Sequence, residues 1–270
     1  MKTRHVPLHR TGHSSRRAAR LAAIVGLFAL CGCATVDRGA PKAAGGPIEI
    51  QDRRQRLVTL ALQEWTLWGR PRIEASGRSL GRPDPSASTA PTVPRNEHEP
   101  DYTSRVLMYW FVLRGSDFAP QRALLADGSL TPWSAVFISF LMHAAGIPRE
   151  VFPPSARHWD YIKRAHDFPD PSGFEALDAT RTAPRVGDLI CATRSRTTGV
   201  VTTFAQLASD ASRGTYHCDL VVRVSPGTLG AIGGNVRDAV TWTDVPLDAG
   251  GRLRPTASRP WLVVLRNNLR

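Results

Sequence analysis

Apolar side chains recur at helical spacing through residues 130–146, and both ends of this stretch carry helix signals. Thr131 suits an N-cap, and Pro132 suits the first helical position, where a missing N–H costs nothing. Gly146 is a typical stop. The apolar positions are Trp133, Val136, Phe137, Phe140, Leu141 and Ala144. The pattern predicts a helix with one face in the core, and it places Ser134 in the first turn.

Periodicity elsewhere predicts three more helices followed by four strands. The helices are 52–68, 101–113 and 156–165, the last capped by Ser155, and the strands are 187–192, 217–224, 229–233 and 261–266. A polar insertion with one short helix, 204–208, precedes the second strand. Helices first and antiparallel strands afterwards indicate an α+β fold. Residues 71–100 are rich in Pro, Ser and Arg without apolar periodicity, which predicts a long loop or a disordered insertion.

The beginning of the chain has the pattern of an export signal rather than of a fold. Residues 1–20 carry six basic side chains and no acidic one, and residues 21–30 form an apolar run. That run is too short for a permanent membrane span. It ends at residues 30–33 in Leu-Cys-Gly-Cys, which resembles a bacterial lipobox and implies cleavage before Cys33 with lipidation of its thiol. Ala34 after the cysteine implies a lipid anchor in the outer membrane, on its periplasmic face.

The expected organisation is therefore a signal peptide, 1–32, a lipidated cysteine with a flexible tether, 33–50, and one domain, 51–270. The full chain of 270 residues has a formal charge of +12, and the signal holds six of its positive charges. Removing them leaves about +6, which weakens the case for a nucleic-acid partner. We expect the membrane, through the lipid, and an envelope component to be the partners.

After processing, Cys191 and Cys218 are the two remaining cysteines. An oxidising compartment permits one disulfide between them, and free thiols stay an alternative. No cysteine or histidine pair has metal-ligand spacing, so we expect no metal and no cofactor.

Four segments in order resemble the papain-like peptidoglycan amidases and endopeptidases of the NlpC and CHAP type. Residues 133–139, Trp-Ser-Ala-Val-Phe-Ile-Ser, resemble the helix start of that superfamily, which carries Cys where Ser134 stands. The other three segments are Arg-Val-Gly-Asp-Leu at 185–189, His-Cys-Asp-Leu-Val-Val at 217–222 and Ile-Gly-Gly-Asn-Val at 232–236. The resemblance implies a papain-like α+β domain that hydrolyses an amide or peptide bond in peptidoglycan.

The same resemblance implies the catalytic residues. It makes Ser134 the nucleophile, His217 the base and Asn235 the residue that orients the imidazole. The physical setting agrees, because a helix N-terminus favours developing negative charge and a histidine opening an adjacent strand can reach it. A hydroxyl is far less acidic than a thiol, so serine must lose its proton to the base during attack. The alternative is an inactive module that binds peptidoglycan or a protein partner.

Four further residues are candidates for contact with the substrate: Trp133, His158, Asp219 and Gly234. For Trp133, core packing is the competing expectation to a sugar platform. His158 begins a predicted helix, where it either lines the cleft or lies exposed. Asp219 shares a strand face with His217 and competes with Asn235 as its orienting residue. Cys218 should point away from that face.

Overall fold

The computed structural model describes residues 52–81, 96–113, 123–194, 201–209 and 212–270, all within the unit Glu49–Arg270. The predicted signal segment, Cys33 and the tether lie outside the described residues. None of the helices in the described ranges is long and apolar enough to cross a membrane.

The helices form where the apolar periodicity predicts them, with shifted ends. They are α1 (Arg53–Leu67), α2 (Pro100–Trp110), α4 (Ser134–Ala144) and α5 (His158–Asp167), with the 3₁₀ helix η2 at Phe204–Ala208. Two N-terminal caps differ from expectation. Trp133 rather than Thr131 is the N-cap of α4, so Ser134 is the first helical residue. Ser155 stands two residues before the Arg157 N-cap of α5 and accepts the N–H of Arg157.

Eight strands form one sheet in the order β2-β1-β7-β6-β5-β4-β8-β3. Their bounds are β1 Arg72–Glu74, β2 Ser79–Gly81, β3 Phe174–Asp178, β4 Leu189–Thr193, β5 Tyr216–Ser225, β6 Thr228–Gly233, β7 Thr241–Pro246 and β8 Trp261–Asn267. All neighbours pair antiparallel except β1 and β7, which are parallel. The α+β class is thus confirmed.

The sheet is larger than the sequence pattern indicated. The first part of the predicted insertion, 71–100, forms the hairpin β1–β2, because its short strands continue the sheet along the edge of β7. Strands β3 and β7 were also missed. Neither strand shows a strict alternation of buried and exposed positions, which is the pattern that would have indicated a strand.

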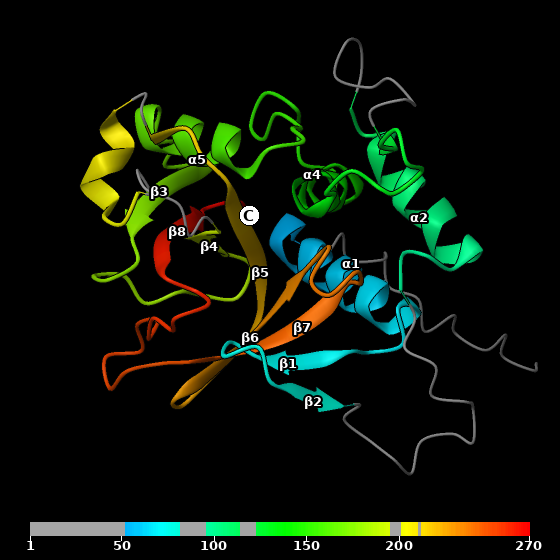
Figure 1. Cartoon of the computed structure of the whole chain (residues 1–270). Helices are drawn as coiled ribbons and strands as arrows, with labels where there is room; N and C mark the ends of the chain where they lie inside the picture. Colours follow the sequence, from blue (N-terminus) through cyan, green and yellow to red (C-terminus); the bar gives the residue numbers. More distant parts are fainter. Residues whose placement is uncertain (1–51, 82–95, 114–122, 195–200, 210–211) are drawn as a thin grey trace, which may run out of the picture. The chain divides into compact units, whose positions relative to one another are not determined.

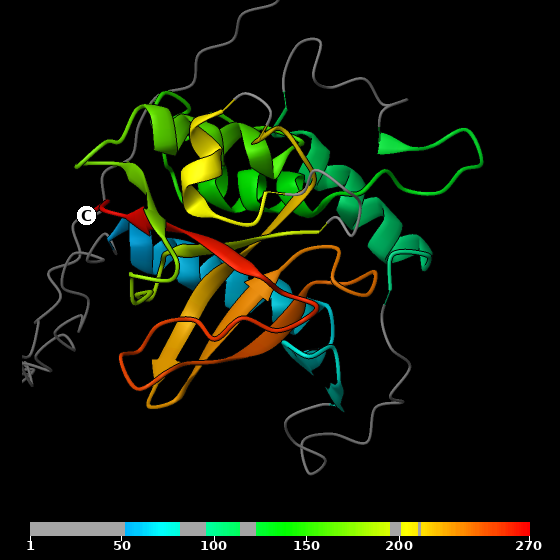
Figure 2. The same cartoon turned by 60° about the vertical axis from the view of Figure 1, so that its left-hand side comes forward.

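The helices α1, α4 and α5 contact the sheet on one face, and α2 packs on α4 (Figures 1 and 2). The main core lies between these layers. A second, smaller core lies on the other side of the sheet and includes Ile190, Val221, Ala231, Val245 and Val264. The segment that joins β7 to β8 reaches β1 there, where Thr256 and Ser258 donate hydrogen bonds to the carbonyl oxygen of Ala75.

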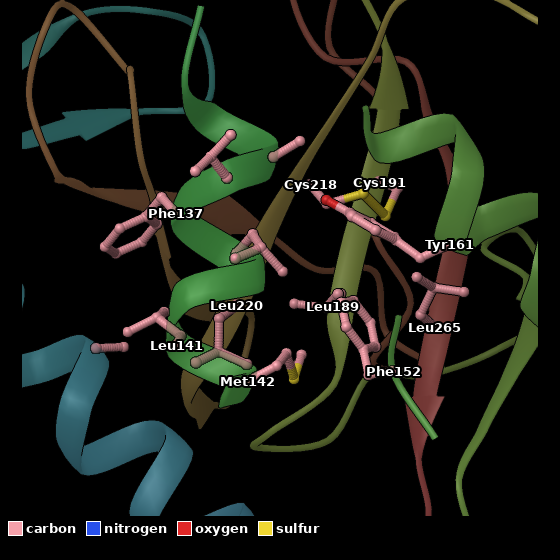
Figure 3. Packing of buried hydrophobic residues seen from close by; sticks show 14 of the residues in the cluster. Phe137, Leu141, Met142, Phe152, Tyr161, Leu189, Cys191, Cys218, Leu220 and Leu265 are labelled. Carbon is pink, nitrogen blue, oxygen red and sulfur yellow. A yellow bond between two sulfur atoms is a disulfide. The ribbon is translucent and has the colours of Figure 1, made fainter. Parts of the chain in front are cut away.

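Side chains from α4, α5 and the central strands meet in the main core, with a disulfide among them (Figure 3). Cys191 on β4 and Cys218 on β5 are directly paired across the two strands and form that bond. Cys218 therefore points into the main core. Strand alternation sends its neighbours His217 and Asp219 to the other face of β5, as predicted.

Candidate active site

Ser134 opens α4 and is nearly buried, with 5% of its surface exposed. The helix starts here because the N–H of Phe137 donates to the carbonyl oxygen of Trp133, which closes the first turn. The first N–H groups of a helix have no partner within the helix, and the positive end of the helix dipole lies beside them. An oxyanion formed next to Ser134 would meet donors that are already in place.

The hydroxyl of Ser134 is hydrogen-bonded to His158, the first residue of α5. The Ser134 Oγ to His158 Nε2 distance is 2.8 Å, and only 4% of His158 is exposed. The other ring nitrogen, Nδ1, is hydrogen-bonded to the hydroxyl of Tyr161, one turn further along α5. Ser134, His158 and Tyr161 thus form a buried chain in which one group holds each nitrogen of the imidazole.

Ser139, one turn after Ser134 on α4, fixes the start of α5 relative to α4. Its buried hydroxyl donates to the carbonyl oxygen of Ser155 at 3.0 Å and accepts the N–H of Ser155 at 3.0 Å. Ser155 in turn donates to Asp160 at 2.5 Å and accepts from Arg157. The start of α5 is therefore tied to α4, which carries Ser134, by hydrogen bonds of the Ser139 and Ser155 side chains.

A second histidine lies against the first. The rings of His158 and His217 have centroids 5.4 Å apart, and His217 Nε2 is 2.7 Å from Asp219 Oδ1. Both members of the His217–Asp219 pair are buried. Gly233 on β6 makes room for the pair, since a Cβ at that position would lie 1.7 Å from Asp219 Oδ1. No larger residue fits beside that carboxylate.

Burial and neighbouring charges set the protonation of these groups. Burial lowers the pKa of His158 well below its usual value, and the adjacent His217 adds to the shift, while Asp219 opposes it. Burial also lowers the pKa of His217. For Asp219, burial alone would raise the pKa, but the charges of His217 and Arg259 and the hydrogen bond from His217 bring it to about 2. At neutral pH the site holds a neutral His158 beside an ionised Asp219.

This electrostatic setting predicts how stability depends on pH. The folded-state pKa of both His158 and His217 is lowered, so below about pH 6.5 the unfolded chain binds more protons than the folded one. The free energy of unfolding should then fall with decreasing pH, by about 1.4 kcal/mol per pH unit for each histidine. Urea unfolding between pH 7.5 and 5.5 measures the slope, and His158→Gln should reduce it by about half. An unchanged slope in that variant would contradict the burial of a neutral His158.

The structure corrects the expected partners within the site. His158, not His217, is hydrogen-bonded to Ser134, because α5 begins beside the start of α4. His158 is buried rather than exposed. His217 is held by Asp219 instead of Asn235, and within the described residues Asn235 forms no hydrogen bond with it. Asn235 lies in the left-handed region, with φ of 54°, in the loop after β6.

Two of the residues expected to contact substrate are core residues. Trp133 is fully buried, and its indole Nε1 donates to Glu97 Oε2 at 2.6 Å, so it offers no surface to a sugar. Gly234 lets the chain pass close to α4, since a Cβ there would lie 2.7 Å from Trp133 and 2.6 Å from Phe137. Asp219 is also buried, and its carboxylate is hydrogen-bonded to His217.

The contact between Tyr161 and His158 is the feature of the site that the sequence did not indicate. One pattern in the sequence could have indicated this contact. Tyr161 lies three residues after the candidate His158, and this spacing places both side chains on one face of a helix. The partner of the histidine could be recognised only once α5 was placed against α4. In the described part of the chain, no group of three or more His, Cys, Asp or Glu side chains is arranged to hold a metal ion.

The comparison with protein families gives one match that covers more than half of the chain. The family model described as an uncharacterised protein conserved in bacteria, DUF2272, matches residues 102–267. This range includes Ser134, His158, His217 and Asp219. No curated protein matches the chain, and no solved structure matches it. The chain therefore belongs to the DUF2272 family.

Proposed function

We propose that the protein is a serine hydrolase that cleaves an amide or peptide bond in peptidoglycan, with Ser134 as nucleophile and His158 as base. The observation that carries the proposal is the 2.8 Å contact between Ser134 Oγ and His158 Nε2 at the start of a helix. A base within hydrogen-bond reach of a hydroxyl, itself held by a third group, is the arrangement that activates serine. The papain-like sequence pattern supports the substrate class.

The chemistry follows from the tautomer in which His158 Nε2 is free to accept. The hydroxyl of Ser134 donates to Nε2, and Nδ1–H donates to the oxygen of Tyr161. As Ser134 Oγ attacks the carbonyl carbon, Nε2 takes its proton, and the oxyanion faces the N–H groups that open α4. His158 then returns the proton to the leaving amine, and water hydrolyses the acyl-enzyme with the same histidine as base.

The remaining groups tune this base. Burial raises the pKa of Tyr161 well above its usual value, so it stays a neutral hydroxyl that orients the ring of His158. The lowered pKa of His158 keeps its imidazole neutral at neutral pH, with Nε2 available to accept a proton. The charge on Asp219 favours the imidazolium that forms during attack, since it raises the pKa of His158. His217 places that charge by holding the carboxylate.

The proposed location follows from the sequence before the domain. The lipobox-like stretch that ends at Cys33 supports a lipid anchor on the periplasmic face of the outer membrane, where peptidoglycan is within reach. The disulfide between Cys191 and Cys218 supports an oxidising compartment. A papain-like core, with the nucleophile helix packed on an antiparallel sheet, is the fold that we propose for the domain.

A fluorophosphonate reagent tests the proposal, because it reacts with activated serine hydroxyls and leaves ordinary ones unmodified. We expect one phosphonyl group per chain, on the tryptic peptide that contains Ser134, and none in Ser134→Ala. Ser104→Ala, which removes an exposed helical serine, should label as the unsubstituted chain does. Equal labelling of Ser134→Ala, or no labelling of the unsubstituted chain, would count against an activated serine.

A further inference from the structure

A cavity of about 310 Å³ opens beside the buried site, at the end of the sheet where β4 finishes and β8 begins. Three arginines line it: Arg194 after β4, Arg237 in the loop between β6 and β7, and Arg259 before β8. The volume lies at the lower end of the range for sites that bind small molecules. Thr193, the last residue of β4, is part of the lining, and it pairs with Tyr216, the residue before His217 on β5.

Within the described ranges, the arginines of this cavity lack a direct carboxylate partner, although the buried Asp219 acts on Arg194 through its charge. Among the described residues, none of the three arginines has an ion pair with a carboxylate. The one acidic residue of the lining, Glu74, is paired with Arg78. Guanidinium groups without a carboxylate partner, gathered around one cavity, suit an anionic ligand.

The cavity is also built with backbone strain. Asn235 and Arg237 both have φ of 54°, and Asp238 has φ of 59°, a left-handed conformation that costs energy in residues with a side chain. The guanidinium of Arg237 donates to the carbonyl oxygen of Gly77, which ties this loop to the hairpin β1–β2. Asn and Asp tolerate this region better than other residues, so the strain falls on Arg237, and the loop presents Asn235 to the cavity.

The cavity and the buried site are electrostatically connected. After burial and His217, the charges of Arg194 and Arg259 both lower the pKa of His158. Burial raises the pKa of Asp219, whereas nearby positive charges lower it. Of these charges, His217 has the largest effect and Arg259, from the cavity, the second largest. Gly233, which makes room for the His217–Asp219 pair, is two residues from Asn235. A ligand anchored in the cavity would thus lie within electrostatic reach of His158, the residue bonded to Ser134.

We propose that this cavity binds a carboxylate of the substrate, so that the protein acts on acidic peptides, with Arg194 and Arg259 as the carboxylate anchors. The assignment of the bound ligand as a substrate rests on the proposed hydrolase function. The fork of an arginine matches the two oxygens of a carboxylate, and two arginines at one cavity distinguish a free carboxylate from an amide. Asn235 adds an amide that can hydrogen-bond to the peptide backbone.

Calorimetric titration of the Ser134→Ala chain tests the cavity without turnover. The probes are N-acetyl-alanyl-glutamate and the same dipeptide with both carboxyl groups amidated. We expect the acid to bind at least about 10-fold more tightly than the diamide. Arg194→Gln and Arg259→Gln should each weaken binding of the acid about 10-fold.

The control is Arg53→Gln, which removes the same charge from an exposed position at the start of α1. The neighbouring Arg54 lies beside Gly187, which precedes β4, whereas Arg194 follows that strand. It should leave the affinity within about twofold. The proposal falls if acid and diamide bind equally, if neither binds, or if Arg53→Gln weakens binding as much as Arg194→Gln does. It also falls if inorganic phosphate binds as tightly as the dipeptide, because the cavity is then a general anion site.

The two proposals fail separately. Arginine-dependent binding of the acid without any hydrolysis by the unsubstituted chain would leave the cavity assignment intact and remove the enzyme. Hydrolysis of wall peptide that treats acidic and amidated peptides alike, in the unsubstituted chain and in Arg259→Gln, would leave the enzyme intact and remove the cavity assignment.

Discussion

Replacing Ser134 with alanine should lower the rate of wall-peptide hydrolysis by more than about 10³-fold, because the covalent route then has no nucleophile. The fold should persist, since the change removes one small hydroxyl from the start of α4.

His158→Gln, which keeps most of the side-chain volume, should lower the rate of wall-peptide hydrolysis by about 10²–10⁴-fold. Release of new amino groups from purified peptidoglycan measures both losses, and circular dichroism checks that each variant is folded.

Ser134→Cys identifies the base directly. A thiol at a helix N-terminus beside an imidazole should have a lowered pKa and should react with iodoacetamide near neutral pH faster than a free cysteine. Labelling of the unsubstituted chain gives the background from Cys31 and Cys33. The geometry predicts that adding His158→Gln slows this alkylation more than adding His217→Gln, since His158 is the residue bonded to position 134.

The opposite order would return the role of base to His217, as the sequence pattern implied. Alkylation at the rate of a free cysteine in every combination would remove the nucleophile–base pair altogether. If only Ser134→Cys hydrolyses wall peptide, the natural protein is an inactive relative that has kept its base, and the domain serves binding.

The second large effect concerns the disulfide between Cys191 and Cys218. Their sequence separation is 27 residues, and closing a loop of that length in the unfolded chain is worth about 3–4 kcal/mol. Cys191→Ala together with Cys218→Ala should therefore lower the free energy of unfolding by about that amount. Urea unfolding of the oxidised chain and of the double variant measures the difference.

Reduction with dithiothreitol distinguishes the stability that comes from the disulfide bond from the stability that comes from the packing of its sulfur atoms. The reduced unsubstituted chain should lose most of the same stability, whereas dithiothreitol should not change the double variant. Equal urea midpoints for the oxidised chain and the double variant would show that the bond does not constrain the fold. Because Cys218 stands between His217 and Asp219, loss of the bond should also lower activity by loosening β5.

Local pattern in the sequence was sufficient for the helices and for the central strands. The apolar repeat around Phe137 and Leu141 fixed α4, and the signals in 217–224 and 229–233 located β5 and β6 to within a residue or two. Strands β1, β3 and β7, which the sequence pattern did not predict, are stabilised by pairing with strands that lie far away in the chain. β1 has three residues and exists because it pairs with β7, about 170 residues later in the chain.

The sequence predicted which residues form the site, but not which of them are hydrogen-bonded to one another. Ser134, His158, His217 and Asp219 were all candidates, and the structure brings them together. Which histidine meets Ser134 depends on where α5 lies relative to α4, and that is decided by contacts such as Ser139 with Ser155. No spacing within one segment carries such information, because the two helices are joined by a long connection.

The position of β8 has a consequence for how the chain folds. This strand lies between β4 and β3, although it follows both of them in the chain by about 70 residues or more. This edge of the sheet therefore cannot assemble in the order of synthesis, and among the described strands β3 has no partner until β8 is inserted. Pairings of such long sequence separation are slow to form. The edge formed by β8 and β3 therefore stays incomplete until the end of the chain is available to fold.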